Sequence, residues 1–223
     1  MNFAIITQQL VSGMGSSLMI FVLTLLFSMP LGLLVAFGRM SKIKPLQAVI
    51  KVFIAILRGT PLMLQLLVVN FAPYYLFRIS LPRWYRFAAI IIGFSINYAA
   101  YFAEIYRSGI ESIPKGQYEA ASVLGYNKNQ TFFRIIFPQM VKRVLPPVTN
   151  EVTSVITSFV TLVKDTSLAF VLAYEEMFTV AKQIASARTS IMPLFVAGVF
   201  YFIFNGVVAF AMERIEKKLS YYH

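Results

Sequence analysis

The sequence contains no cysteine and little charge. The absence of cysteine excludes disulfides and thiolate metal sites. Charged residues make up only 13% of the chain, about half of their share in an average soluble protein, whereas 58% of the residues are hydrophobic. Histidine occurs once, as the C-terminal His223, so we expect neither a catalytic site nor a metal site. This composition is typical of an integral membrane protein.

Acidic residues are scarcer than basic ones. Nine Asp and Glu stand against 20 Lys and Arg, which gives a net charge of +11. In a soluble protein this excess would suggest nucleic-acid binding. No nucleic-acid motif is present, and membrane proteins collect Lys and Arg in their cytoplasmic loops. We therefore expect the lipid bilayer as a partner and no nucleic acid.

Five apolar segments are long enough to cross a bilayer, which takes about 20 residues. They cover about 15–38, 46–77, 85–106, 145–163 and 192–212. Each is expected to be helical, because lipid offers the backbone no hydrogen-bond partner. Pro61 falls inside the second segment and should bend or break it. The predicted fold is all-α, in one integral membrane domain over residues 1–223.

Basic residues predict the topology of these segments. Most of them lie in the connections after the first and third segments and in the C-terminal tail: Arg39, Lys42, Lys44, Arg107, Lys115, Lys128, Arg134, Lys142, Arg143, Arg214, Lys217 and Lys218. If these parts face the cytoplasm, the N-terminus lies outside the cell and the C-terminus inside.

A polar, amphipathic stretch separates the third and fourth segments. It reads EAASVLGYNKNQTFFRIIFP and covers residues 119–138. Glu119 suits a helix N-terminus, Gly125 a left-handed helix end, and Asn127 or Asn129 the start of a second short helix that Pro138 ends. Amphipathicity alone leaves two interpretations equally open, a helix resting on lipid headgroups or a docking element for a cytoplasmic partner.

The spacing within this stretch resembles the signature loop of ABC importer permeases. The residues that fall on the pattern are Glu119, Ala120, Ala121, Gly125, Ile135 and Pro138, while Phe137 replaces the usual Leu. In that family the loop forms a coupling helix seated in a groove of the ATP-binding subunit. The resemblance therefore implies that residues 115–140 are a coupling loop that docks an ATPase.

Other blocks resemble the polar amino acid subfamily of these permeases. They are Arg58-Gly59-Thr60-Pro61, the run from Tyr101 to Ile110, Asn150-Glu151 and Lys164-Asp165-Thr166-Ser167-Leu168. The resemblance implies a multi-pass membrane subunit of a type I ABC importer in a prokaryotic cell membrane. Such a subunit moves a polar amino acid inward by alternating access.

The same resemblance implies several partners. ATP and Mg²⁺ are held by a separate ATPase subunit, so this chain is neither an enzyme nor a cofactor carrier. An extracellular solute-binding protein delivers the amino acid. Because five helices are few to enclose a pathway, we also expect a second permease copy or a paralogue, which makes a dimer.

The fourth segment carries the candidate substrate pathway. Thr153, Thr157 and Thr161 recur every four residues on one face, and Asn150-Glu151 precede them. Close helix packing and an interfacial salt bridge are the plainer alternatives. The resemblance favours a pathway role, because the matching Asn-Glu pair lines the substrate cavity in relatives. The spacing from Glu151 to Lys164 is longer than in the subfamily by about seven residues, or about two helical turns.

Three other charged sites have plainer interpretations. Glu104 is expected to pair with Arg107 at i,i+3. Arg58 and the following Gly-Thr-Pro are expected to be architectural. Glu175 and Glu176 lie in an external stretch that either contacts a solute-binding protein or forms a solvated loop.

Two other classes of function remain as alternatives to the permease. A stand-alone, ion-coupled secondary carrier would need midplane acids and paired repeats, and only Glu151 comes close. A membrane enzyme would need a metal cluster or an activated nucleophile, and neither is visible in the sequence. No phosphate-binding Walker motif is present, so the energy must come from another chain.

Overall fold

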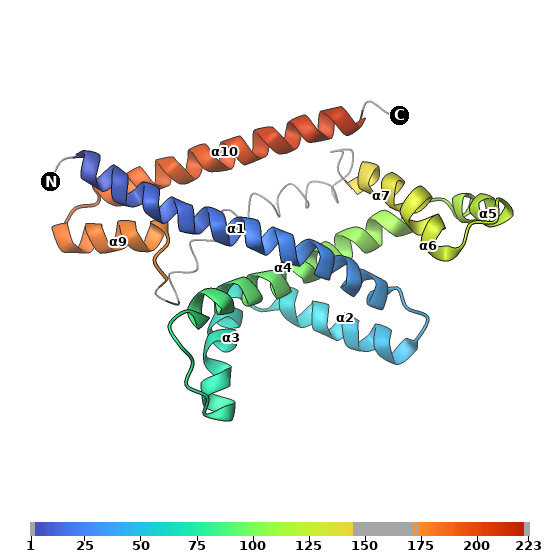
Figure 1. The fold of residues 1–223 in the computed structure, drawn as a ribbon, viewed down its shortest axis with the longest axis horizontal. Helices are drawn as coiled ribbons and strands as arrows, with labels where there is room; N and C mark the ends of the chain where they lie inside the picture. Colours follow the sequence, from blue (N-terminus) through green and yellow to red (C-terminus); the bar gives the residue numbers. More distant parts are fainter. Residues whose placement is uncertain (1–2, 145–171, 173, 221–223) are drawn as a thin grey trace.

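The computed structural model describes residues 3–144, 172 and 174–220, and within these ranges all regular elements are helices. Three of them are long and apolar enough to cross a membrane: α1 (Phe3–Arg39), α4 (Tyr85–Glu111) and α10 (Met192–Ser220) (Figure 1). These helices coincide with the first, third and fifth predicted segments. The fourth predicted segment, 145–163, lies outside the described residues.

The second predicted segment is broken where the sequence predicts it. It forms α2 (Lys44–Gly59) and α3 (Leu62–Phe77), whose axes are bent by 110° relative to each other. Thr60 takes an extended backbone because the ring of Pro61 disfavours the α conformation in the residue before it. Counted as one span, this pair brings the candidate spans to four among the described residues.

α4 is the central helix of the molecule. In its most apolar stretch 67% of the residues are buried, against 33% in α1 and 6% in α10. α1 crosses α4 closely at Gly32, where a Cβ atom would lie only 2.7 Å from the Cβ of Phe102. The core around Ile20, Ile90 and Phe94 therefore forms where α1, α3 and α4 meet, while α10 leaves most of its surface exposed.

α9 (Met177–Arg188) packs against α1 and α10 near the N-terminus of the chain (Figure 1). Its N-cap is Glu176, which is fully buried, whereas its neighbour Glu175 is exposed. The expectation of a solvated or partner-binding carboxylate is therefore wrong for Glu176. The residue faces inward because its carboxylate accepts hydrogen bonds from the backbone N–H groups of Phe178 and Thr179 at the start of the helix.

Candidate functional site

The stretch after α4 forms two short helical pieces joined at a glycine. The first piece is α5 (Lys115–Val123), which Pro114 precedes as the N-cap residue. Glu119 is thus the fifth residue of α5, and the prediction that it begins the helix is wrong. Pro114 sets the start instead, because proline has no N–H and its φ already suits the entry to a helix.

The end of α5 matches the prediction. Gly125 has a φ of +76°, in the left-handed region that favours glycine. Its N–H donates to the carbonyl of Ser122, and the N–H of Tyr126 donates to the carbonyl of Ala121, both at 3.0 Å. This is the Schellman arrangement, which satisfies carbonyls that the helix end would otherwise leave unpaired. Gly125 therefore makes the corner of the loop.

Asn127 begins the second piece. The sequence predicts either Asn127 or Asn129 for this place, and the structure confirms Asn127. Its side chain accepts from the N–H of Gln130 at 2.9 Å, and the Gln130 side chain accepts from the N–H of Asn127 at 3.0 Å. This reciprocal capping box satisfies two donors of the first turn. The helix runs on as α6 (Lys128–Gln130), a π-helical turn η1 (Thr131–Ile136) and α7 (Phe137–Val144).

Pro138 does not end this helix, which corrects the prediction. It is the second residue of α7, which follows directly on η1. The N–H of Phe137 donates to the carbonyl of Phe132, five residues back, so the turn is wider than in an α-helix. The wider turn changes the spacing of the carbonyls that the proline ring would meet in a regular α-helix, and the helix can continue.

An apolar cluster anchors the second piece to α4 and α1. Its buried members are Ile110, Ile113, Ile136 and Met140. The ring of Phe132 meets the ring of Phe37 of α1 edge to face, with the centroids 5.0 Å apart. In addition, the Gln139 side chain donates to that of Gln117, which ties α7 to α5 at 3.1 Å. The loop is therefore held by the ends of both long helices.

The signature residues divide between the two faces of this loop. Ala121 is buried and Ile135 is half-buried, whereas Glu119, Ala120, Gly125 and Pro138 are exposed. Large apolar side chains are exposed beside them, with Val123 at 87% and Leu124 at 72%. Partial burial raises the pKa of the Tyr118 hydroxyl in α5. The outer face thus offers apolar side chains at the end of the molecule where α5 lies (Figure 1).

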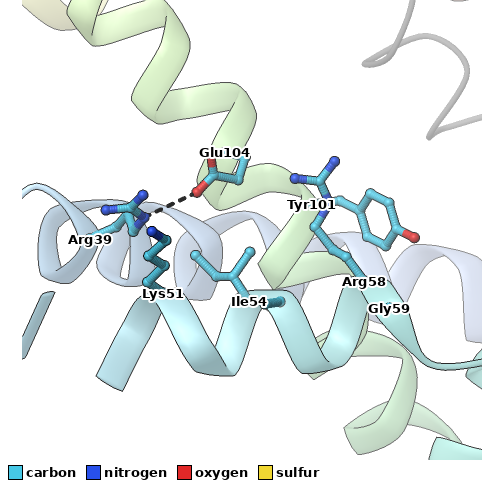
Figure 2. A pocket seen from close by; sticks show the side chains of 8 residues that line it. Arg39, Lys51, Ile54, Arg58, Gly59, Tyr101 and Glu104 are labelled. Carbon is cyan, nitrogen blue, oxygen red and sulfur yellow. Dashed lines mark ion pairs between the residues drawn. The ribbon is translucent and has the colours of Figure 1, made fainter. Parts of the chain in front are cut away.

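A row of ion pairs leads from α1 along α4 toward this loop. Glu104 pairs with Arg107 at 2.8 Å, which confirms the predicted i,i+3 pair. Glu104 also meets Arg39 at the end of α1, at 3.5 Å (Figure 2). Arg107 in turn pairs with Glu111 at 2.6 Å. The carboxylate of Glu104 therefore joins α1 to α4 about two turns before α4 ends.

A pair of amide side chains, the half-buried Gln65 and the buried Asn97, holds the break between α2 and α3. The Gln65 amide donates to the carbonyls of Leu57 and Thr60, at 2.8 and 3.1 Å, and to the Thr60 hydroxyl. Asn97 of α4 donates to the same Leu57 carbonyl at 3.1 Å and to Gln65 Oε1 at 2.8 Å. These bonds satisfy carbonyls that the broken helix leaves free. Sequence reasoning missed both residues, although an isolated amide within an apolar run is a recognisable signal.

The proposed substrate-pathway residues, Asn150, Glu151, Thr153, Thr157 and Thr161, lie outside the described residues. The pathway assignment therefore stays a prediction. Within the described parts of the chain no group of three His, Asp or Glu side chains could hold a metal ion.

Residues 28–221 match the family model of the binding-protein-dependent transport system inner membrane component. The chain is 36% identical over 203 residues to the L-cystine transport system permease protein TcyB of Bacillus subtilis, covering 90% of this chain and 82% of that protein. It is 29% identical to the arginine transport system permease protein ArtQ of the same organism, covering 95% and 92%.

Solved structures have the same fold. An amino acid ABC transporter crystallised with histidines superposes with a TM-score of 0.80 at 28% identity, covering 95% of this chain and 94% of that chain. An inward-facing structure of the MetNI methionine ABC transporter superposes with a TM-score of 0.75 at 17% identity, covering 98% and 99%. At that identity the second likeness concerns the fold alone.

Proposed function

We propose that the chain carries a polar amino acid into the cell. It belongs to the family of binding-protein-dependent transport system inner membrane components, and it is a type I ABC importer permease of the polar amino acid subfamily. As in its relatives, which are permease subunits and not enzymes, ATP hydrolysis resides in a separate subunit. ATP-driven closure of two ATPase subunits would switch the permease between inward- and outward-facing states.

The observation that carries the coupling role is the division of the 115–140 loop into two faces. One face is anchored through Ile136 and Met140, which are at most 1% exposed. The other leaves Val123 and Leu124 exposed on a helix end that a glycine corner holds in place. Exposed apolar side chains on a rigid support are suited to seat in a groove of a partner. We assign this face to the ATPase.

Other parts of the proposal follow from the family and the sequence. They comprise five spans with the N-terminus outside and the C-terminus in the cytoplasm, a second permease copy or paralogue, and an extracellular solute-binding protein. The exposed apolar surface of α10 fits a place against lipid or against another permease. The relatives include permeases named for L-cystine, glutamine and arginine, which supports an amino acid as the substrate.

The test replaces exposed apolar residues of the loop with a charge. Leu124→Asp should abolish co-purification of the ATPase subunit and ATP-driven uptake in vesicles, because a carboxylate would have to enter an apolar contact without a partner. Ile79→Asp, at a 50% exposed position in the α3–α4 connection, is the matched control and should keep both. Both variants must insert at wild-type levels. Undiminished ATPase binding and uptake in Leu124→Asp would disprove the coupling role.

A further inference from the structure

A basic cavity lies between α1, α2 and α4, on the side of the molecule away from α9. Its volume is about 430 Å³, and it is lined by Arg39, Lys51, Ile54, Ala55, Arg58, Gly59, Tyr101 and Glu104. Three of these side chains are cationic and one is acidic. Figure 2 shows Lys51 and Arg58 on one side of α2, facing the α4 residues Tyr101 and Glu104.

The acid does not neutralise this cavity. Glu104 already pairs with Arg39 at 3.5 Å and with Arg107 at 2.8 Å. Among the described residues neither Lys51 nor Arg58 has a carboxylate within ion-pair distance. The guanidinium of Arg58 lies over the ring of Tyr101, 5.2 Å from its centroid, which holds the group in place without neutralising it. Two cations therefore remain available to an anion.

The surroundings of the cavity indicate which kind of anion. Arg39 is the last residue of α1, so the cavity lies where an apolar span ends and the membrane interface begins. The cavity lies between helices that enter or cross the apolar layer. A basic cavity between such helices, at the end of an apolar span, suits the anionic headgroup of a lipid whose hydrocarbon tails lie in the bilayer.

We propose that this cavity binds the phosphate of an anionic phospholipid, with Lys51 and Arg58 as its charge partners and the acyl chains in the surrounding bilayer. A guanidinium can hold two phosphate oxygens at once, while an ammonium acts as a point charge. The Arg39–Glu104 pair forms the wall of the site and connects it to the ion pairs that lead toward the 115–140 loop. The site is independent of the coupling role proposed above.

The test measures lipid affinity on the full-length permease, purified in detergent with any subunit that stays bound. Native mass spectrometry follows the first molecule of dioleoyl-phosphatidylglycerol to bind wild type and Lys51→Gln/Arg58→Gln. Each cation near an anionic headgroup contributes about fivefold, so the double variant should bind about thirtyfold more weakly. Arg83→Gln/Arg86→Gln removes the same charge at the opposite, exposed end of α4 and should bind as wild type does.

Two further measurements separate charge from fold and lipid from small anions. Lys51→Arg/Arg58→Lys keeps both charges and should retain most of the affinity, which excludes a folding defect as the cause of the loss. Inorganic phosphate, or a mixture of free amino acids, should not displace the lipid, because neither has acyl chains that hold it in the apolar layer around the protein. Equal affinity in wild type and Lys51→Gln/Arg58→Gln would overturn the proposal. Displacement by phosphate or by amino acids at similar concentrations would also overturn it and assign the cavity to a small solute.

Discussion

Replacing Glu176 with alanine should destabilise the packing of α9 more than any surface change nearby. The carboxylate is fully buried, and several donors reach it. Backbone N–H groups of Phe178 and Thr179 donate at 2.9 and 2.7 Å, the Thr179 hydroxyl at 3.0 Å, the Tyr201 hydroxyl at 2.8 Å and the Ser17 hydroxyl at 3.3 Å. One side chain thereby joins α1, α9 and α10.

The magnitude follows from these bonds. Loss of the helix cap costs about 1 kcal/mol. Leaving a buried hydroxyl or N–H without its acceptor costs about 1–3 kcal/mol, part of which is offset because a charge no longer has to be buried. We expect about 3 kcal/mol for Glu176→Ala. For a domain of this size that corresponds to a Tm lower by about 6–12 °C. Glu176→Gln keeps one acceptor oxygen and should lose about half as much.

The assay is thermal unfolding of the purified chain in detergent, followed by circular dichroism. Glu175→Ala, next in sequence and exposed, is the control and should stay within about 0.5 kcal/mol of wild type. Tyr201→Phe completes a double-mutant cycle, and the double variant should lose less than the sum of the two single losses. Equal Tm values for Glu176→Ala and Glu175→Ala, or strict additivity with Tyr201→Phe, would refute the reasoning.

Three further predictions concern backbone geometry and buried amides. Gly13→Ala should lower the free energy of unfolding by about 1–3 kcal/mol, because the added Cβ would lie 2.7 Å from the Cα of Met177. Gly15→Ala is the control: its Cβ would meet nothing within 4 Å, so its stability in the same unfolding assay should equal that of wild type. Gln65→Leu should cost about 1–3 kcal/mol because the carbonyls of Leu57 and Thr60 lose a donor, and an unchanged Tm would contradict this role. Gly125→Ala should cost about 1 kcal/mol and reduce ATPase co-purification, because the φ of Gly125 is +76° and an L side chain is strained there. Gly116→Ala is the control and should leave co-purification intact, because an added Cβ meets nothing within 4 Å. Equal co-purification in the two variants would show that the corner does not position the docking face.

Local chemistry explains which features could be predicted. The break at Pro61, the left-handed Gly125 and the cap at Asn127 each depend on a few neighbouring residues, so the sequence contains their whole cause. The i,i+3 pair of Glu104 and Arg107 is equally local. The prediction from Glu119 places the start of α5 too late, because Pro114 already has a φ that suits the entry to a helix and lacks the N–H that a helix start leaves unpaired.

Other features depended on residues far apart in the sequence. Pro138 continues its helix through a π turn whose Ile136 is held against α4, and no local rule contains that contact. Gln65 and Asn97 meet because α3 folds back along α4. Glu176 is buried because Ser17 and Tyr201, each more than 20 residues away, supply donors.

By itself, the sequence determined the membrane class, the first, third and fifth helical spans, the break in the second segment, the glycine corner and the family. These depend on composition and on short-range backbone preferences, which act within a few residues. Only the tertiary structure decided which polar side chains are buried and satisfied, and which cations remain available. Those outcomes depend on whether another helix places a partner within reach of the side chain. Glu104 of α4 pairs with Arg39 of α1, whereas Lys51 and Arg58 have no carboxylate within ion-pair distance among the described residues.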